Sequence, residues 1–250
     1  MGNWIERLSE PSRLILAWQA PDHFEDRFRW AVAIIERESE HFVLRYLDPE
    51  SEFLALNQGR SFDSLLSLSY NGYPGLSVRR GTHKDGILDI LMRRLPPRTR
   101  PDFEDFKTQF RISREVRPSD LALLGYTEAK LPSDGFSLVN ELDPNTPECD
   151  LMLEVAGYRY YVGGLPLSLR VGESIELITE PDNPYDPLAV QVCLRGQKIG
   201  NINRLQAATF QRWLKERQIT GTMERLNGAA TKPRAFIFLR IRAATERAAA

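Results

Sequence analysis

Cysteine and histidine are scarce in this sequence of 250 residues. Its two cysteines, Cys149 and Cys193, and its three histidines, His23, His41 and His83, show no paired spacing that suits a tetrahedral metal. We therefore predict neither a metal site nor a disulfide scaffold, and we expect no cofactor. Cys193 lies in the apolar run of residues 188–194, so we interpret it as a small core residue.

Long apolar runs are also missing. No stretch reaches the roughly 18 to 20 apolar residues that a membrane helix needs, and the first residues lack a cationic segment followed by an apolar one. We therefore expect a soluble, cytoplasmic protein that has no membrane partner.

Recognisable catalytic arrangements are absent as well. None of the histidines lies in a motif that places it beside a nucleophilic serine or cysteine. The carboxylates Asp102, Glu104 and Asp105 begin a predicted helix, where the helix dipole favours negative charge without any metal. We expect the chain not to be an enzyme, although carboxylates that folding brings together remain an open alternative.

The composition, with 42% hydrophobic and 27% charged residues, is that of a globular protein, and the length suits two domains. The net charge of −1 hides an asymmetry. Residues 151–243 carry 13 Lys and Arg against 8 Asp and Glu, whereas residues 1–150 carry 19 against 25. A basic carboxy-terminal part suits contact with phosphates, and an acidic amino-terminal part suits a different partner.

The amino-terminal part alternates between strand and helix patterns. Residues 13–19, 29–36 and 41–47 predict an antiparallel meander, because β-branched and aromatic residues recur with a period near two. Apolar residues at helical spacing predict helices at residues 87–95 and 102–110. Ser119 is placed to cap a short helix, and residues 136–139 predict a strand. We assign residues 1–142 to an α+β domain and residues 143–149, which contain Pro144 and Pro147, to a linker.

The carboxy-terminal part is mainly β. We predict strands at residues 151–156, 174–180, 188–194, 198–203, 219–226 and 233–242, with a helix at 204–217. Six short strands in roughly 90 residues suggest a small closed or nearly closed barrel with one or two helices. We assign residues 150–243 to this barrel and residues 244–250 to a frayed tail.

Three motifs of this part carry chemistry suited to nucleic acid. Residues 157–163 (GYRYYVG) place an arginine beside tyrosines at a predicted strand end, and such rings stack on bases while guanidinium pairs with phosphate. Tyrosines that merely pack inside a barrel are the alternative. Residues 180–190 (EPDNPYDPLAV) predict a rigid turn that presents Tyr185 and Asp186, and residues 196–204 (GQKIGNINR) predict a hairpin that enters a helix.

In this order and spacing, the three motifs resemble the HIRAN domain over about 90 residues. The resemblance implies a modified OB-like or SH3-like barrel that binds single-stranded DNA and captures a free 3′ end. It further implies that Arg159 holds the DNA backbone and that Tyr160 stacks on a base, with Tyr161 beside them. Tyr185 would stack on the terminal base, and Asp186 would accept a hydrogen bond from the 3′ hydroxyl.

One residue departs from the family pattern. The studied eukaryotic domain has a histidine where this sequence has Asn201, which predicts a weakened phosphate contact and a less strict recognition of the end. Arg204 occupies a nearby basic position that would replace the charge, and a solvated residue at a helix start is the alternative interpretation.

The amino-terminal half leaves two interpretations open. Arg93, Arg94, Arg98 and Arg100 lie close together, and carboxylates of the same domain are more plausible partners for them than phosphates. A helix ending at Leu95 and Pro96, with Leu123-Leu124-Gly125 and residues 129–136 after it, resembles the small amino-terminal subdomain of HipA-type toxin kinases on pattern alone.

Our main hypothesis is a non-enzymatic accessory protein that binds single-stranded DNA, in DNA repair, restriction or phage defence in bacteria. Its acidic domain would dock a protein partner. The alternative is a component of a HipA-like toxin–antitoxin system that acts through protein contacts.

Overall fold

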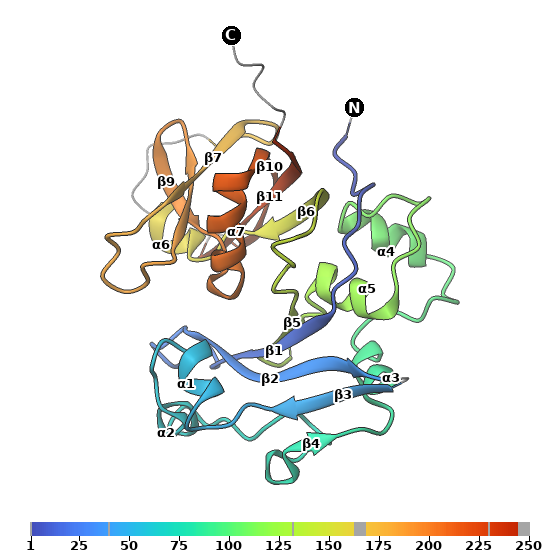
Figure 1. Cartoon of the computed structure of the whole chain (residues 1–250). Coiled ribbons are helices and arrows are strands. Elements are labelled where there is room, and N and C mark those ends of the chain that lie inside the picture. Colours follow the sequence, from blue (N-terminus) through green and yellow to red (C-terminus); the bar gives the residue numbers. More distant parts are fainter. Residues whose placement is uncertain (1, 40, 132, 163–168, 230, 245–250) are drawn as a thin grey trace. The chain divides into compact units, whose positions relative to one another are not determined.

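The computed structural model describes residues 2–39, 41–131, 133–162, 169–229 and 231–244 (Figure 1). The chain divides into two compact units. The N-terminal unit is Glu10–Phe106 with Pro118–Glu141, and the C-terminal unit is Met1–Ser9, Lys107–Arg117 and Leu142–Ala250. Of the predicted tail at residues 244–250, residues 245–250 lie outside the described part.

The N-terminal unit contains a five-stranded antiparallel sheet in the order β4-β3-β2-β1-β5. The strands are β1 (Arg13–Gln19), β2 (Arg29–Glu38), β3 (His41–Tyr46), β4 (Thr82–His83) and β5 (Phe136–Val139). The predicted meander of the first three strands is confirmed. The sequence analysis did not predict β4, which is too short to show an alternating pattern.

Helices pack against this sheet because its central strands are apolar on both faces. Residues 14–18 of β1 are all buried, as expected for an uninterrupted apolar run. The unit's helices are α1 (Glu52–Leu56), α2 (Phe62–Leu66), the 3-10 turn η1 (Val78–Arg80), α3 (Ile87–Met92) and α5 (Asp120–Thr127), and α4 (Phe103–Gln109) spans the boundary to the other unit. Ser119 caps α5 as predicted, accepting a hydrogen bond from the Ala122 amide at 3.0 Å.

The C-terminal unit contains a six-stranded antiparallel sheet in the order β6-β11-β10-β7-β8-β9. The strands are β6 (Cys149–Glu154), β7 (Ser174–Thr179), β8 (Val190–Leu194), β9 (Gln197–Asn201), β10 (Arg217–Ala229) and β11 (Lys232–Ala243). Helix α7 (Arg204–Glu216) packs against β8 and β10 and buries Phe210 and Trp213 on its apolar side. In the described part of the chain, no helix is long and apolar enough to cross a membrane.

The sequence analysis predicted a closed or nearly closed barrel, and a closed barrel is not found among the described residues. Strands β6 and β9 form the two edges of the sheet, and among the described residues only one isolated bridge, between Ala156 and Asn201, joins the two ends. Strand patterns report which residues alternate between faces, but closure depends on how far the sheet coils. This unit is therefore a coiled open sheet whose ends meet at a single point.

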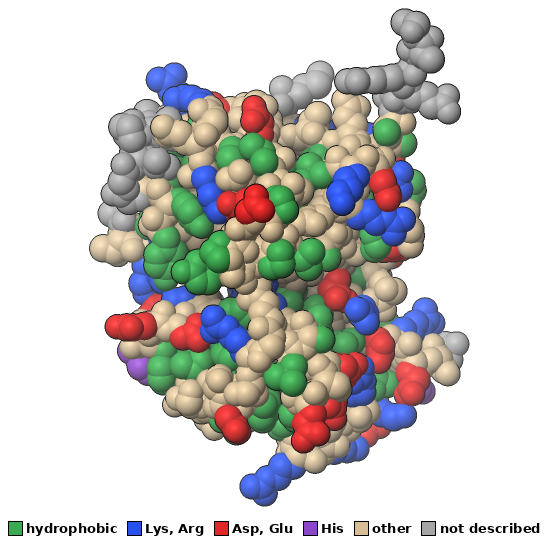
Figure 2. All heavy atoms as spheres, turned by 60° about the vertical axis from the view of Figure 1, so that its left-hand side comes forward, with side chains coloured by type: hydrophobic (Ala, Val, Ile, Leu, Met, Phe, Trp, Pro, Cys, Tyr) green, Lys and Arg blue, Asp and Glu red, His purple; other side chains and the backbone are tan. Residues whose placement is uncertain are grey.

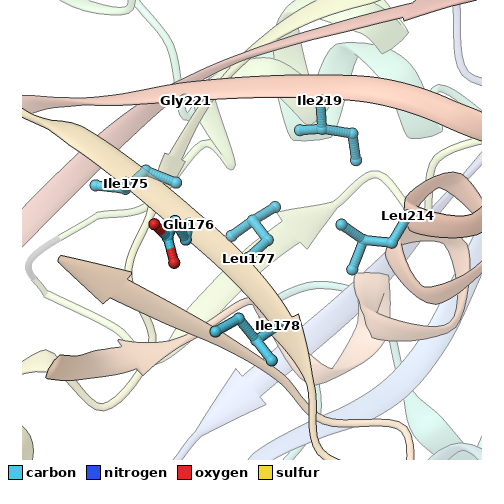
Figure 3. A pocket seen from close by; sticks show the side chains of 7 residues that line it. All are labelled: Ile175, Glu176, Leu177, Ile178, Leu214, Ile219 and Gly221. Atoms are coloured by element: carbon cyan, nitrogen blue, oxygen red, sulfur yellow. The ribbon is translucent and has the colours of Figure 1, made fainter. Parts of the chain in front are cut away.

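A groove of about 310 Å³ opens where the ladder between β7 and β10 stops. The two strands pair only at Ile175 with Gly221 and Ser174 with Thr222. Beyond the Ile175–Gly221 pair the strands separate, and Leu214 of α7 lines the gap together with Ile178 and Ile219 (Figure 3). The groove thus exposes part of the apolar core between the sheet and α7.

The C-terminal unit includes two segments that the sequence analysis assigned to the amino-terminal domain. The Ile5 amide donates to the Arg111 carbonyl oxygen at 2.6 Å, and the Ser113 amide donates to the Ile5 carbonyl oxygen at 3.2 Å. The Asp150 carboxylate accepts from the amides of Glu6 and Arg7. Pairings between residues so distant in the sequence leave no local pattern.

The predicted linker at residues 143–149 packs on α7. The Trp213 indole donates to the Pro144 carbonyl oxygen at 3.0 Å, and the Arg212 guanidinium donates to the Asn145 side chain at 3.1 Å. Thr146 is buried. The proline-rich composition thus marks a turn that is part of the C-terminal unit.

Both cysteines are buried free thiols, which confirms the core position predicted for Cys193. Burial and the nearby Asp150 carboxylate raise the pKa of Cys149 to about 12, and burial also raises that of Cys193. Because the thiolate is the reactive form, we expect iodoacetamide at neutral pH to label neither cysteine in the native protein and both after denaturation. Mass spectrometry checks this, and a cysteine labelled in the native protein would contradict it.

Candidate nucleic-acid interface

The first motif forms a helical turn, α6 (Tyr158–Val162), where the sequence analysis expected a bent strand end. Gly157 makes the turn possible with a φ of +73°, and the Tyr158 side chain is buried. Tyr160 and Tyr161 are 65% and 37% exposed, so they are available for contact. Gly163, the last residue of the motif, lies outside the described residues.

Two side-chain groups extend from α6. The Arg159 guanidinium donates to the Tyr160 hydroxyl at 2.5 Å, and its central carbon lies 4.7 Å from the centre of the Tyr160 ring. The Tyr161 hydroxyl accepts from the Asn201 amide nitrogen at 3.5 Å, and the Lys198 ammonium lies 4.8 Å from the centre of the Tyr161 ring. The motif on α6 and the motif on β9 are therefore neighbours.

Gly200 permits this approach of β9 to α6. A Cβ atom at Gly200 would lie 2.4 Å from Val155 Cγ1 and 2.6 Å from the Ala156 carbonyl oxygen, and its φ is +154°. The Ala156 and Asn201 backbones exchange two hydrogen bonds next to it, at 2.8 and 2.9 Å. Only glycine fits this crossing without moving the backbone.

The second motif is a loop that presents Tyr185, whose side chain is 88% exposed. The Asn183 side-chain oxygen accepts from the amides of Tyr185 and Asp186, at 3.0 and 3.2 Å, which fixes the turn as predicted. Asp186 Oδ1 accepts from the Leu188 amide at 2.9 Å. The Gln211 side chain on α7 also donates to the Pro187 carbonyl oxygen.

Lys198, which the sequence analysis did not select, connects the loop to the rest of the site. Its ammonium group contacts both oxygens of Glu180, at 2.8 and 2.7 Å, and Glu180 begins the loop. Burial works against the charged form, but the Glu180 carboxylate and Tyr161 outweigh it and raise the pKa of Lys198. The sequence offered one signal for selecting Lys198, which is its position in the third motif, two residues before Gly200.

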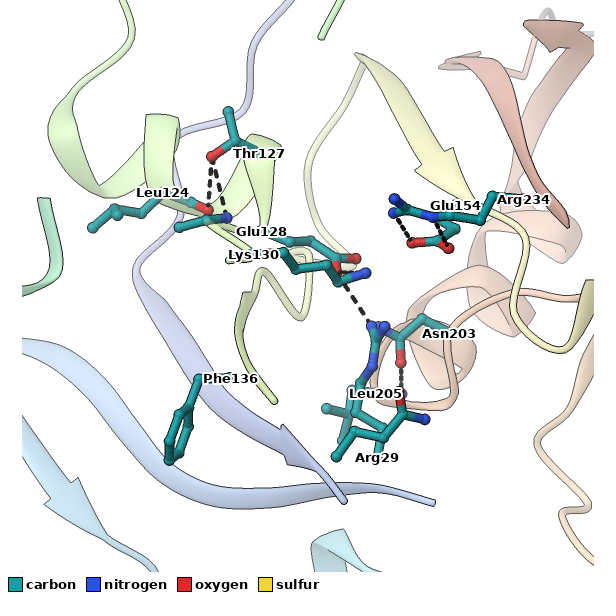
Figure 4. Close-up of polar contacts among 12 residues, drawn as sticks. Arg29, Leu124, Thr127, Glu128, Lys130, Phe136, Glu154, Asn203, Leu205 and Arg234 are labelled. Carbon is teal, nitrogen blue, oxygen red and sulfur yellow. Dashed lines mark hydrogen bonds and ion pairs between the residues drawn. The ribbon is translucent and has the colours of Figure 1, made fainter. Parts of the chain in front are cut away.

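The remaining predicted residues lie where β9 leads into α7. Asn203 caps α7 by accepting from the Leu205 amide at 3.2 Å (Figure 4), and Arg204 is half-buried at the first position of the helix. Asn201 Oδ1 and Asn203 Nδ2 are buried and have no hydrogen-bond partner among the described residues. Buried polar atoms without partners cost free energy that a ligand would recover.

The site therefore joins Tyr161, Lys198, Asn201 and the loop at Glu180 through contacts, with the Arg159–Tyr160 pair on the same turn as Tyr161. Among the described residues, no three His, Cys, Asp or Glu side chains form a group that would hold a metal ion. The arrangement combines exposed aromatic rings with cations, which suits stacked bases and phosphates.

A comparison with protein-family models decides the identity of this unit. The model of the HIRAN domain matches residues 150–242. These residues form a HIRAN domain. HIRAN domains are known as nucleic-acid-binding domains, so the family indicates nucleic acid as the partner of this domain.

Two solved structures are also similar to this chain. The crystal structure of the HIRAN domain of human HLTF is 26% identical, covers 37% of this chain and 74% of that chain, and has a TM-score of 0.30. The crystal structure of a protein from Lactobacillus plantarum is 23% identical, covers 38% of this chain and 99% of that chain, and has a TM-score of 0.29. No curated protein matches this chain.

The comparisons give no support to the HipA-like interpretation of the amino-terminal half. Three of its four clustered arginines have carboxylate partners within the same unit, as the sequence analysis favoured: Arg94 with Asp134, Arg98 with Asp120, and Arg100 with Asp102. Basic and acidic side chains lie next to one another on the face drawn in Figure 2. Net charge alone therefore does not locate the nucleic-acid site of the HIRAN domain.

Proposed function

We propose that this chain is a non-enzymatic accessory protein whose HIRAN domain binds single-stranded DNA and captures its 3′ end. The observation that carries the proposal is the 88% exposure of Tyr185 on a loop that its own hydrogen bonds hold rigid. An exposed aromatic ring on a fixed loop costs little entropy to order and offers a flat surface to a base.

Each side chain of the site receives a role in this proposal. Tyr185 and Tyr160 stack on bases, and Arg159 and Lys198 pair with backbone phosphates. Asp186 accepts a hydrogen bond from the 3′ hydroxyl through Oδ2, since Oδ1 already accepts from the Leu188 amide. A carboxylate near phosphates is unfavourable unless it accepts such a hydrogen bond, so Asp186 would select a free end over an internal nucleotide.

Asn201 would contact phosphate more weakly than the histidine that the studied eukaryotic domain has at this position. Its amide nitrogen donates to the Tyr161 hydroxyl, and we propose that this bond orients Tyr161 toward the strand. Arg204, at the start of α7, would supply a cation beside it. The amino-terminal α+β unit would dock a protein partner, and the chain would act in DNA repair, restriction or phage defence.

The test is fluorescence anisotropy of the full chain with a short single-stranded DNA that has either a free or a blocked 3′ hydroxyl. We expect Tyr185→Ala to weaken binding about 10-fold, as the loss of one stacked base predicts. We expect Asp186→Ala to abolish the preference for the free end. Leu188→Ala and Asp182→Ala, in the same exposed loop, are the matched controls and should bind like the wild type.

Two results would change the proposal. Equal affinity for free and blocked ends, with Tyr185→Ala still weakened, would reduce it to general binding of single strands. If the wild type bound no strand even at low salt, where phosphate contacts are strongest, nucleic-acid binding by this chain would be refuted.

A further inference from the structure

A second cationic surface lies on the C-terminal unit, on the sheet face formed by β6, β10 and β11. Arg225 on β10 is paired in register with Phe236 on β11, and Arg234 lies two residues before Phe236. Their guanidinium carbons lie 5.7 and 5.0 Å from the centre of the Phe236 ring. Both guanidinium groups therefore contact the same ring.

A third arginine completes this surface. Arg111 reaches it because residues 107–117 belong to the C-terminal unit, and its guanidinium contacts the buried Glu224 carboxylate at 2.5 Å. The Gln109 carbonyl oxygen, from the same segment, accepts a hydrogen bond from Arg225. We call Arg111, Arg225 and Arg234 the arginine cluster.

The cluster has more positive than negative charge. Arg234 pairs with Glu154 through two contacts of 2.7 Å (Figure 4), and Arg111 pairs with Glu224. Within the described part of the chain, Arg225 forms no ion pair. Burial and the like charges of Arg111 and Arg234 lower the pKa of Arg225, and Glu224 offsets only part of this effect. An added anion would relieve the repulsion.

Strand β6 links the cluster to the site on α6. Strand β6 pairs Glu154 with Phe236, and the Val155 amide extends the ladder by donating to the Ala235 carbonyl oxygen at 2.9 Å. Two residues later Gly157 turns the chain into α6, which carries Arg159 and Tyr160. Glu154, the ion-pair partner of Arg234, and Arg159 on α6 are therefore only five residues apart in the sequence.

We propose that the arginine cluster binds backbone phosphates of a single strand whose end is held at the α6 and Tyr185 site. This inference rests on the proposed function and extends it to longer strands. Guanidinium groups that are preorganised on an aromatic ring suit the paired oxygens of a phosphate. Phe236 is a platform for the cations, because both guanidinium groups lie over its ring.

The experiment compares strands of about 6 and about 20 nucleotides, since domains of the OB fold that bind single strands cover roughly 4 to 16 nucleotides. For the full chain carrying Arg225→Gln and Arg234→Gln, we expect unchanged binding of the short strand and about 10-fold weaker binding of the long one. The slope of log affinity against log salt for the long strand should become shallower by about 1.4, at roughly 0.7 per phosphate contact of a single strand.

The matched control carries Arg195→Gln and Arg212→Gln, which also removes two exposed, carboxylate-paired arginines of this unit and should bind both strands normally. A second variant, Arg225→Lys with Arg234→Lys, keeps the charge and should restore most of the salt slope. If it bound as weakly as the glutamine variant, packing and not charge would explain the loss.

Three other results would overturn the inference. Unchanged long-strand binding of the glutamine variant would refute the cluster alone and leave the 3′-end site intact. Competition by polyglutamate as strong as by DNA would assign the cluster to an acidic protein partner. Failure of the wild type to bind either strand would refute the proposed function as well.

Discussion

Gly200→Ala is expected to destabilise the C-terminal unit by about 3 kcal/mol and to abolish strand binding at the α6 site. The added Cβ would lie 2.6 Å from the Ala156 carbonyl oxygen, a backbone atom that a side-chain rotation cannot move away. Moving the Ala156 backbone away from this Cβ atom would break the two hydrogen bonds between Ala156 and Asn201. Calorimetry measures the stability, and anisotropy measures the binding.

The control for this prediction is Gly196→Ala, in the turn between β8 and β9. Gly196 also has a positive φ, +74°, but a Cβ atom there would meet nothing within 4 Å. We expect a cost of about 1 kcal/mol from backbone strain alone, with normal DNA binding. Equal effects of the two substitutions would show that the close approach to Ala156 does not position the site.

Asp134→Ala is expected to destabilise the N-terminal unit by about 3 to 5 kcal/mol, because it leaves the Arg94 guanidinium buried without its carboxylate. The Arg94 side chain is only 4% exposed, and two bonds of 2.9 Å join it to Asp134. Burial disfavours its charge, yet Asp134 and Tyr73 together raise the pKa of Arg94. Denaturant unfolding of the full chain measures the loss.

Asp102→Ala is the matched control, since Asp102 pairs with Arg100 at a solvent-exposed position. Exposed pairs contribute between 0 and about 1 kcal/mol, so this substitution should have little effect. The double variant Arg94→Met with Asp134→Ala should recover part of the stability, because no buried charge remains. A loss from Asp134→Ala no larger than that from Asp102→Ala would contradict the buried-pair explanation.

Much of the secondary structure was predictable because its causes are local. The recurring β-branched and aromatic residues of 13–19, 29–36 and 41–47 predicted three strands that are present, and Ser119 was predicted as a cap from its own side chain. Asn183 fixes the Tyr185 loop through hydrogen bonds to residues two and three positions ahead. Such contacts are visible in the sequence because each partner lies nearby.

The site was predictable only in part. Tyr160, Tyr185 and Asp186 belong to recognisable motifs, and the structure places them on α6 and the loop. The helical turn of α6 was missed because tyrosine and valine favour strands, and here tertiary packing against β9 and β11 overrides that preference. Lys198 was missed because its partner Glu180 lies 18 residues away.

The sequence alone determined the period of each main strand and helix, the rigid loop at Asn183 and the HIRAN motifs, since these depend on residues a few positions apart. Only the tertiary structure decided that the sheet stays open, that residues 2–9 and 107–117 join the C-terminal unit, and that Arg111 pairs with Glu224, next to Arg225 in the sequence. The physical reason is that closure and charge clustering depend on side chains distant along the chain, whose meeting no local pattern records.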